Sequence, residues 1–384
     1  MENKATVAIV QCREYEKTAV YEAVKAGLKL LGGIKKILGK KKKILLKPNI
    51  LHGDAPERCS ATHPYILYGI GRVLKENGFS VVYGDSPAVD KTEWAVRRGG
   101  FAEIADELGI ELADFSTGVE VKNPDAKQNK VFNIAKSVLE CDAIINLPKM
   151  KTHGLTRMTG AIKNMFGVIP GLKKAWFHAR IPDPEKFSQM IVDLHLSVKP
   201  VLNIMDAIFG MEGNGPRNGV PRHTGLLLFS ADSVAIDATA CRIMGISPGK
   251  VPLLQRAADS GLGHWQSEEI QLLGCPLEEC RGKPYKVHPP STKTFGNSPI
   301  QKHIKRLIIP RPVIKKSMCT KCGVCVKICP VSPKALTQMK GKQPEFDYNI
   351  CIRCYCCQEV CPDGAISIKV PPLGVIFHGF GSRF

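Results

Sequence analysis

Two cysteine runs near the end of the chain carry the clearest chemical signal. The first reads CTKCGVCVKICP and the second reads CIRCYCCQEVCP, and both have the spacing C-x2-C-x2-C-x3-C-P. This spacing places thiolates around a cubane iron–sulfur cluster, and in proteins with two such runs the fourth cysteine of each run binds the other cluster. We therefore predict two 4Fe–4S clusters. One is held by Cys319, Cys322, Cys325 and Cys361, and the other by Cys351, Cys354, Cys357 and Cys329.

The other cysteines suggest no further site. Eight of the fifteen cysteines lie in the two runs and seven are scattered, which is not the pattern of a disulfide scaffold. Cys356 falls outside the cluster spacing and is interpreted as a small apolar residue or a spare thiol. Cys275 and Cys280 could bind a metal, but isolated cysteine pairs usually do not. One cluster could be structural, whereas two interlocked clusters offer a short electron path and favour a redox function.

A second group of side chains suited to chemistry follows an apolar strand in the middle of the chain. The segments NLPKMKTHG and TGAIKN bring Lys149, Lys151, His153 and Lys163 within fifteen residues. Buried without an anion, these groups would repel one another, and a bound carboxylate or phosphate would relieve the repulsion. The lysines could neutralise negative charge that develops during a reduction, and the histidine could deliver a proton. A solvated basic loop would explain the same residues without a ligand.

Alternating apolar strands and helices must position these groups. The alternation predicts an α/β fold with an open, largely parallel sheet and flanking helices, and ligands bind beyond the carboxyl ends of strands in such sheets. The segments LKPN, GDSP and NLPKMKTHG all follow strands. The glycine-rich segment 210–225 is predicted to be a flexible loop. Expected strands are 6–12, 43–50, 80–83, 110–115, 141–147, 201–207 and 226–230, and expected helices are 15–31, 64–77, 93–108, 185–198 and 233–244.

Length and composition indicate at least two domains. We expect an α/β domain over 1–281, a linker over 282–317, a small α+β two-cluster ferredoxin-like domain over 318–369 and a tail over 370–384. The chain is 44% hydrophobic, so it can bury a large core. No signal peptide or membrane span is recognised, and oxygen-sensitive clusters suit a reducing cytoplasm, most plausibly that of an anaerobe.

The charge balance suits anionic partners. Lys and Arg number 54 against 35 Asp and Glu, a formal net charge of +19, which each oxidised cluster would lower by roughly two charges. Such a surface fits an anionic substrate or an acidic electron carrier, although a generally basic solvated surface is an equal alternative. Nucleic-acid binding is disfavoured because aromatic residues are not interleaved with the lysines.

Several common active-site motifs are absent from the sequence. There is no G-x-x-x-x-G-K-[ST], G-x-S-x-G or H-E-x-x-H, and Gly69-Ile-Gly71 lies in a helical pattern rather than after a strand. Asp85, Asp206, Glu212 and Asp237 could bind a divalent metal, but capping and turn roles explain each of them equally well.

Several long segments resemble, in order, the family called domain of unknown function 362. These segments are LKPNI, GDSP, INLPKMKTHGLTRMTGAIKNMFGVIPG, MDAIFGMEGNGP and SVAIDATACRIMG. Members of this family often carry a C-terminal ferredoxin-type domain, and the resemblance implies an α/β domain without a general assigned activity. It implies a site at the matching motif positions, which are Lys47, Asn49, Asp85, Asn146, Lys149, Lys151, His153, Lys163 and Asn164.

Two hypotheses of different classes follow. The first is a ferredoxin-linked oxidoreductase that receives electrons from an external low-potential donor, such as an acidic ferredoxin or flavodoxin. It would reduce an anionic small molecule, with Lys151 and His153 catalytic and Lys47, Asn49, Asp85, Asn146, Lys149, Lys163 and Asn164 binding the substrate. The second is an electron-transfer or activator protein that reduces a partner enzyme, with the α/β domain as a docking or sensing module.

Overall fold

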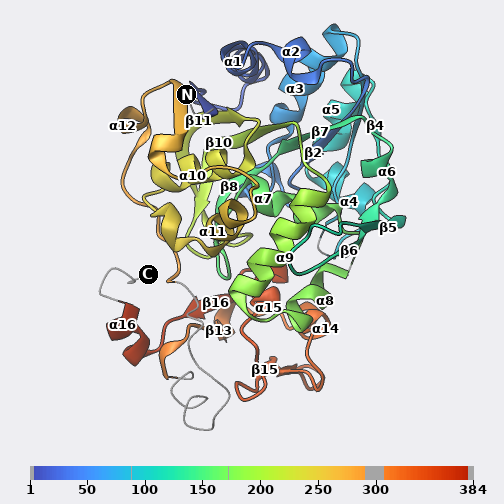
Figure 1. Ribbon diagram of the computed structural model, residues 1–384. Helices are drawn as coiled ribbons and strands as arrows, with labels where there is room; N and C mark the ends of the chain where they lie inside the picture. Colours follow the sequence, from blue (N-terminus) through green and yellow to red (C-terminus); the bar gives the residue numbers. More distant parts are fainter. Residues whose placement is uncertain (1–3, 88, 172, 290–306, 379–384) are drawn as a thin grey trace.

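A ten-stranded mixed sheet forms the centre of the larger domain (Figure 1). The computed structural model describes residues 4–87, 89–171, 173–289 and 307–378. Within the main sheet all neighbouring strands are parallel, except that β11 is antiparallel to both of its neighbours and β9 to β8. The strand order is β12 (Ile270–Gly274), β1 (Ala5–Gln11), β11 (Val220–Ser230), β10 (Leu202–Glu212), β7 (Ala143–Leu147), β2 (Lys43–Pro48), β3 (Ser80–Tyr83) and β4 (Glu111–Leu112), with β8 (Lys149–His153) beside β10 and β9 (Arg157–Thr159) beside β8.

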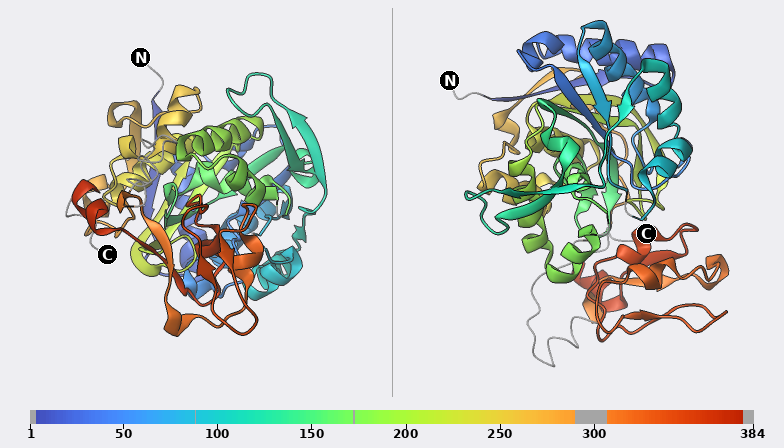
Figure 2. Two further views of the ribbon diagram at one scale, coloured as in Figure 1. Left: turned by 90° about the horizontal axis from the view of Figure 1, so that it is seen from below. Right: turned by 90° about the vertical axis from the view of Figure 1, so that its right-hand side faces the viewer.

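Helices cover both faces of this sheet, as the two views of Figure 2 show. Alternate residues of the strands enter two separate apolar cores, because successive side chains of a strand point to opposite faces. One face carries α1 (Lys17–Leu30), α2 (Ile34–Leu38), α3 (Pro64–Glu76), α4 (Thr92–Arg98) and α5 (Phe101–Leu108). The other face carries α7 (Ala161–Asn164), α9 (Pro184–Ser197), α10 (Ser233–Ile243) and α11 (Pro252–Asp259). The predicted open, largely parallel α/β sheet is therefore confirmed.

Short elements complete the larger domain. The segment after α7 forms a 3-10 turn and then α8 (Lys173–Arg180). A two-stranded hairpin lies outside the main sheet, and two short helices follow β6 and β12. These elements are β5 (Gly118–Lys122), β6 (Val131–Ala135), α6 (Lys136–Leu139) and α12 (Leu277–Cys280).

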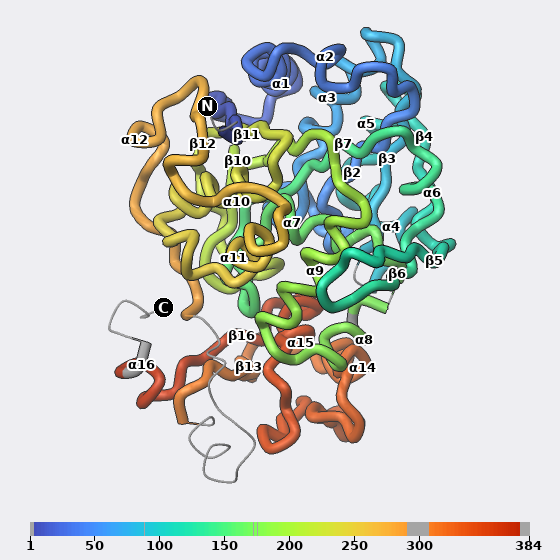
Figure 3. Tube along the Cα trace, in the orientation of Figure 1, coloured from blue at the N-terminus to red at the C-terminus, as the bar shows by residue number. Residues whose placement is uncertain are grey.

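The small C-terminal domain lies against the end of the sheet at which β2, β3 and β7 finish, and the Cα trace of Figure 3 shows the same arrangement. Strand β13 pairs with β16 and strand β14 pairs with β15, so this domain holds two small antiparallel ladders. Its elements are β13 (Arg311–Ile314), α14 (Val324–Ile328), β14 (Leu336–Thr337), β15 (Glu345–Phe346), α15 (Cys356–Val360), β16 (Ile366–Lys369) and α16 (Pro372–His378).

The structure differs from the sequence-based expectation in three places. The predicted helix over 93–108 is two helices, because Gly100 has a left-handed backbone that interrupts it. The predicted loop over 210–225 is mostly strand, since β10 continues to Glu212 and β11 begins at Val220. The segment after β7 is also a strand, β8, rather than a loop. Part of the predicted linker, 290–306, and part of the tail, 379–384, lie outside the described residues.

Candidate functional site

Cysteines of the two runs lie close together. The four cysteines predicted to hold the first cluster, Cys319, Cys322, Cys325 and Cys361, all line one hollow. Burial and the neighbouring Cys361 and Cys322 raise the pKa of Cys325 to about 11. Burial, followed by Cys354, Cys351, Cys325 and Cys329, raises the pKa of Cys357 well above its usual value. Thiolates that crowd together in this way need a cationic centre, and a cubane cluster, which spreads four thiolates around four irons, fits both sets. Among the described residues, no group of three or more His, Cys, Asp or Glu forms a site for a single metal ion.

Side-chain hydrogen bonds fix the small domain to the loop between β10 and β11. Arg217 forms a two-pronged ion pair with Asp54, with N–O distances of 2.9 and 2.8 Å, and donates to the Val360 carbonyl at 2.9 Å. Asn218 donates to the Cys361 carbonyl at 3.0 Å. Gln358 of α15 donates in return to the Asn214 carbonyl at 2.8 Å. The loop predicted only to be flexible therefore holds the second cysteine run in place.

A cavity of about 720 Å³ lies where the two domains meet. Strand ends, the turn after α7 and helix α8 form one side, while α14 and α15 of the small domain form the other. Cys356, the cysteine between two predicted cluster ligands, is part of this wall. The polar lining residues are Asn49, Asp85, Ser86, Thr159, Lys163, Asn164, Lys174, His178, Cys356 and Glu359, and the apolar ones include Ile50, Leu51, Phe166, Ile328 and Val360.

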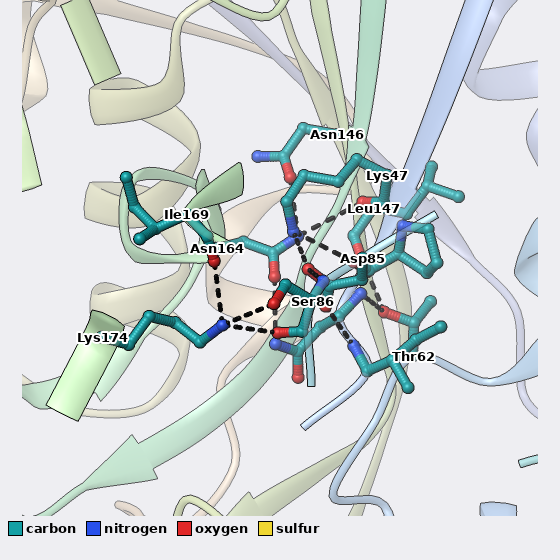
Figure 4. Close-up of polar contacts among 12 residues, drawn as sticks. Lys47, Thr62, Asp85, Ser86, Asn146, Leu147, Asn164, Ile169 and Lys174 are labelled. Carbon is teal, nitrogen blue, oxygen red and sulfur yellow. Dashed lines mark hydrogen bonds and ion pairs between the residues drawn. The ribbon is translucent and has the colours of Figure 1, made fainter. Parts of the chain in front are cut away.

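A buried ion pair anchors the floor of the cavity (Figure 4). The Lys47 ammonium lies 2.8 Å from Asp85 Oδ1, and both side chains are almost fully buried. Asp85 Oδ2 accepts the Ile50 N–H at 2.7 Å, so the carboxylate also orders the chain that follows β2. Burial lowers the pKa of Lys47, although Asp85 opposes this effect. Because the two charges satisfy one another, this pair positions the floor without supplying a free charge.

Asparagine side chains extend this floor. Asn49 Nδ2 donates to Asn164 Oδ1 at 3.0 Å, and Asn164 Nδ2 donates to Asn146 Oδ1 at 2.7 Å. Asn146 in turn donates to Asn203 at 2.9 Å. The chain of amides links the ends of β2, β7 and β10 with α7, so four separate segments fix the orientation of two lining residues.

Two lysines bring positive charge to the cavity without a direct ion pair. The Lys163 ammonium forms no hydrogen bond or ion pair with any residue that the structure describes, and burial lowers its pKa, although the nearby Glu359 opposes this effect. Lys174 donates only to neutral oxygens, namely Ser86 Oγ at 2.8 Å, the Ser86 carbonyl at 3.0 Å and the Ile169 carbonyl at 3.0 Å (Figure 4). Burial lowers the pKa of Lys174 to about 7. A bound anion would stabilise the charged form of both lysines.

An acidic residue from the small domain faces these cations. Burial opposes ionisation of Glu359, yet His153, Lys163 and His178 lower the pKa of its carboxyl to about 2. His153 Nε2 lies 3.2 Å from Glu359 Oε1, while His153 Nδ1 accepts the Leu155 N–H at 3.0 Å. A neutral His153 therefore carries its proton on Nε2, toward Glu359. His178 lines the cavity, packs on Phe187 with ring centroids 4.4 Å apart, and its Nδ1 has no partner among the described residues.

The predicted site residues separate into two groups. Lys47, Asn49, Asp85, Lys163 and Asn164 lie at the cavity or its floor, and Asn146 supports Asn164. Lys149, Lys151 and His153 do not line it.

The buried lysines of β8 find partners within the protein. Lys149 lies 2.8 Å from Asp206 and donates to Tyr15 at 2.6 Å, so its counter-charge is a protein carboxylate. Lys151 donates to Asn49 Oδ1 at 2.7 Å and to the Ser60 carbonyl at 2.6 Å. Because it holds the amide of Asn49, Lys151 contacts the site through that residue.

Ser86, Lys174, His178 and Glu359 were not predicted as site residues from the sequence. Ser86 lies in the GDSP segment directly after a predicted strand, and this position at a strand end could have identified it as a site residue. Glu359 lies inside the second cysteine run and Lys174 lies outside every motif, and nothing in their local pattern indicates a shared cavity.

The comparisons agree with this layout. Residues 44–242 match the model of the domain of unknown function DUF362, and residues 311–362 match a 4Fe-4S dicluster domain. A thylakoid-associated protein of Synechocystis sp. is 31% identical over 274 residues, which are 71% of this chain and 85% of that protein.

Two solved structures show weaker likeness. The lactate racemase apoprotein from Thermoanaerobacterium thermosaccharolyticum has a TM-score of 0.42 and 11% identity over 62% of this chain and 57% of its own. A protein from Thermotoga maritima has a TM-score of 0.37 and 14% identity over 66% of this chain and 61% of its own. The chain thus spans less than two thirds of either structure, and its fold is assigned here from its own strand order. By its sequence matches and its domain layout, the chain belongs to the DUF362 family and carries a C-terminal 4Fe-4S dicluster domain.

Proposed function

We propose that this protein is an iron–sulfur oxidoreductase that reduces an anionic small molecule bound in the cavity between its two domains. The dicluster domain supports electron transfer, and bound clusters would supply single electrons at low potential. The observation that carries the proposal is the position of Cys356, which lines the cavity and lies between Cys354 and Cys357 in the chain.

The cavity residues support an anionic ligand. Lys163 and Lys174 line the cavity without a direct ion pair to a carboxylate, and Asn49, Asn164 and Ser86 provide hydrogen-bonding groups beside them. These lysines would bind the anion and stabilise further negative charge as electrons arrive, which is the electrostatic role that a reduction requires. The apolar residues Ile50, Leu51 and Phe166 would hold an uncharged part of the molecule and exclude water.

Two predicted catalytic residues have indirect positions in this proposal. Lys151 orients Asn49, and His153 lies with its Nε2 3.2 Å from Glu359 Oε1. The titratable groups that line the cavity include His178, Glu359 and the two lysines, and these could exchange a proton with a ligand there. Iron–sulfur clusters bound by thiolates suit a reducing compartment, so we propose that the protein is cytoplasmic.

Anaerobic purification from a metabolite extract tests the proposal. Mass spectrometry of the bound small molecules should find the same anion with the unaltered protein and with Lys173→Gln, a matched control because Lys173 is an exposed neighbour of the cavity lysine Lys174. We expect Lys163→Gln and Lys174→Gln to lose at least about 90% of it, the tenfold effect of one charged hydrogen bond. Equal retention by the cavity variants and the control would refute the anion site.

A second candidate is an electron carrier or activator that reduces a partner enzyme. The exposure of Cys322, a predicted ligand of the first cluster, favours it, because a carrier needs a cluster near an accessible surface. The two candidates differ in one measurement. An oxidoreductase with reduced clusters is reoxidised by the retained anion alone, whereas a carrier is reoxidised only after its partner protein is added.

A further inference from the structure

The rim around the first cysteine set is exposed and basic. Lys321 and Cys322 both line the hollow of that set, and both are exposed. Lys316 lies just before the first run and is exposed as well. Asp363 also lines the hollow and accepts a hydrogen bond from Thr320 at 2.6 Å. The hollow therefore opens at a surface where lysines outnumber carboxylates.

A loop from the middle of the small domain adds two more lysines to this surface. Gln338 donates to the Lys321 carbonyl at 3.0 Å and to the Lys342 carbonyl at 2.8 Å. Gln343 donates to the Lys316 carbonyl at 2.6 Å. These bonds hold the loop that carries Lys340 and Lys342 beside the first cysteine run. We define the lysine rim as Lys316, Lys321, Lys340 and Lys342, all of them exposed.

The rim has the properties of a transient protein-docking surface. None of its four ammonium groups forms an ion pair with a carboxylate among the described residues. Two apolar side chains lie among them, since Met318 is 43% and Met339 is 64% exposed. Methionine adapts to different partner surfaces, and unpaired lysines steer an oppositely charged protein during approach. Aromatic side chains on which nucleic-acid bases could stack are absent from the described rim.

We propose that the lysine rim is the docking surface for an acidic electron-carrier protein of the ferredoxin or flavodoxin type. This inference rests on the proposed redox function and adds the partner and the surface that it contacts. The carrier donates one electron to the cluster predicted in the hollow beside the rim and is itself oxidised by one electron. Its carboxylates face Lys316, Lys321, Lys340 and Lys342, while Met318 and Met339 contact an apolar spot beside its cofactor.

Charge reversal tests this surface in the complete iron-loaded protein. The rim variant carries Lys321→Glu, Lys340→Glu and Lys342→Glu. The control carries Lys35→Glu, Lys36→Glu and Lys40→Glu, which change the net charge equally on an exposed part of the α/β domain. An acidic flavodoxin in its fully reduced form is the probe, and stopped-flow absorbance follows reduction of the clusters without oxygen, with rates normalised to iron content.

We expect the rim variant to be reduced at least about tenfold more slowly at low salt and to lose most of its salt dependence. The control should slow by less than about twofold. Lys340 lies outside both cysteine runs, so Lys340→Glu alone replaces the triple variant in this test if the triple variant loses iron. We expect it to slow cluster reduction by about threefold. Equal slowing of rim and control variants, or no slowing of either, would overturn the proposal. Retention of the anion in the cavity does not require a carrier. If the rim variant is reduced normally but the anion is retained, the docking surface is wrong and the proposed function stands.

Discussion

The Arg217 side chain allows a quantitative test of whether the cavity depends on the docking of the small domain. Arg217→Ala removes both prongs of the ion pair with Asp54 and the hydrogen bond to the Val360 carbonyl. Asp54 would stay buried, and Arg58, at 3.5 Å, would be its remaining ion-pair partner among the described residues. Arg217 and Asp54 both belong to the α/β domain, so the loss of their ion pair weakens the loop, whereas the loss of the hydrogen bond to Val360 weakens the docking itself. A hydrogen bond from a charged group contributes about 1.5–3 kcal/mol, and a loss of about 1.5 kcal/mol raises the open population about tenfold.

Alkylation of Cys356 by iodoacetamide, followed by mass spectrometry of the anaerobic iron-loaded protein, reports this opening. Cys356 is 5% exposed in the cavity wall, so its labelling requires the domains to separate. Cys241, fully buried in α10, is an internal control whose labelling should not change. Arg222→Ala is the matched variant, because it breaks an ion pair with Glu212 inside the α/β domain. If Arg217→Ala accelerates the labelling of Cys356 by less than about threefold, or no more than Arg222→Ala does, the reasoning is wrong.

Three further predictions concern the floor, the buried charge and the clusters. Gly167→Ala places a Cβ against Asp85 Oδ1 and 2.7 Å from Lys47 Nζ, so it should lower the free energy of unfolding by about 1–3 kcal/mol. The control is Gly249→Ala, whose Cβ meets Trp265 at an ordinary 3.4 Å and which should leave the Tm unchanged. Burial, with Lys163 and Lys149, lowers the pKa of Lys151 from 10.5 to about 7, so the unfolded chain binds more protons than the folded protein between these two pH values. The free energy of unfolding should therefore rise with pH in this range, by up to about 4–5 kcal/mol. Chemical denaturation of Lys151→Met at several pH values should show a rise that is smaller by this amount. Iron analysis should give about eight irons per chain for Cys356→Ser and markedly fewer for Cys357→Ser; an equal loss in both would make Cys356 a ligand.

Local patterns predicted most of the larger domain. The strand at Ser80–Tyr83 and the helix that begins at Pro64 have the expected bounds, because apolar periodicity, proline and capping side chains act within a few residues of one another. The pattern was misleading where long-range pairing decides the structure. Residues 149–153 contain two lysines and a histidine, yet they form a buried strand because β10 and β9 pair with them and Asp206 neutralises Lys149.

The candidate site was predictable only in part for the same reason. Lys47 lies near the end of β2, Asp85 follows β3 and Asn164 is the last residue of α7, so the rule about strand ends identified the region of the first two. Glu359 is about 200 residues away from the lysine that it faces, Lys163, and approaches it only because the small domain docks at the loop between β10 and β11. No local pattern encodes such a contact.

Under the proposed function, the shared wall of the cavity makes capture of the anion depend on the supply of iron. One apolar cluster belongs to the small domain alone and contains Cys325, Leu336, Cys361, Ala365 and Ile366, and two of these five residues are predicted cluster ligands. A domain whose own apolar cluster is this small depends for its folding on the metal that its cysteines bind. A newly made chain would therefore have its lysines in place on an open cleft, and the cleft would become an enclosed site only after cluster assembly. In an iron-starved cell the protein would accumulate as a form that neither transfers electrons nor sequesters its ligand, so one nutrient would set both capacities at once.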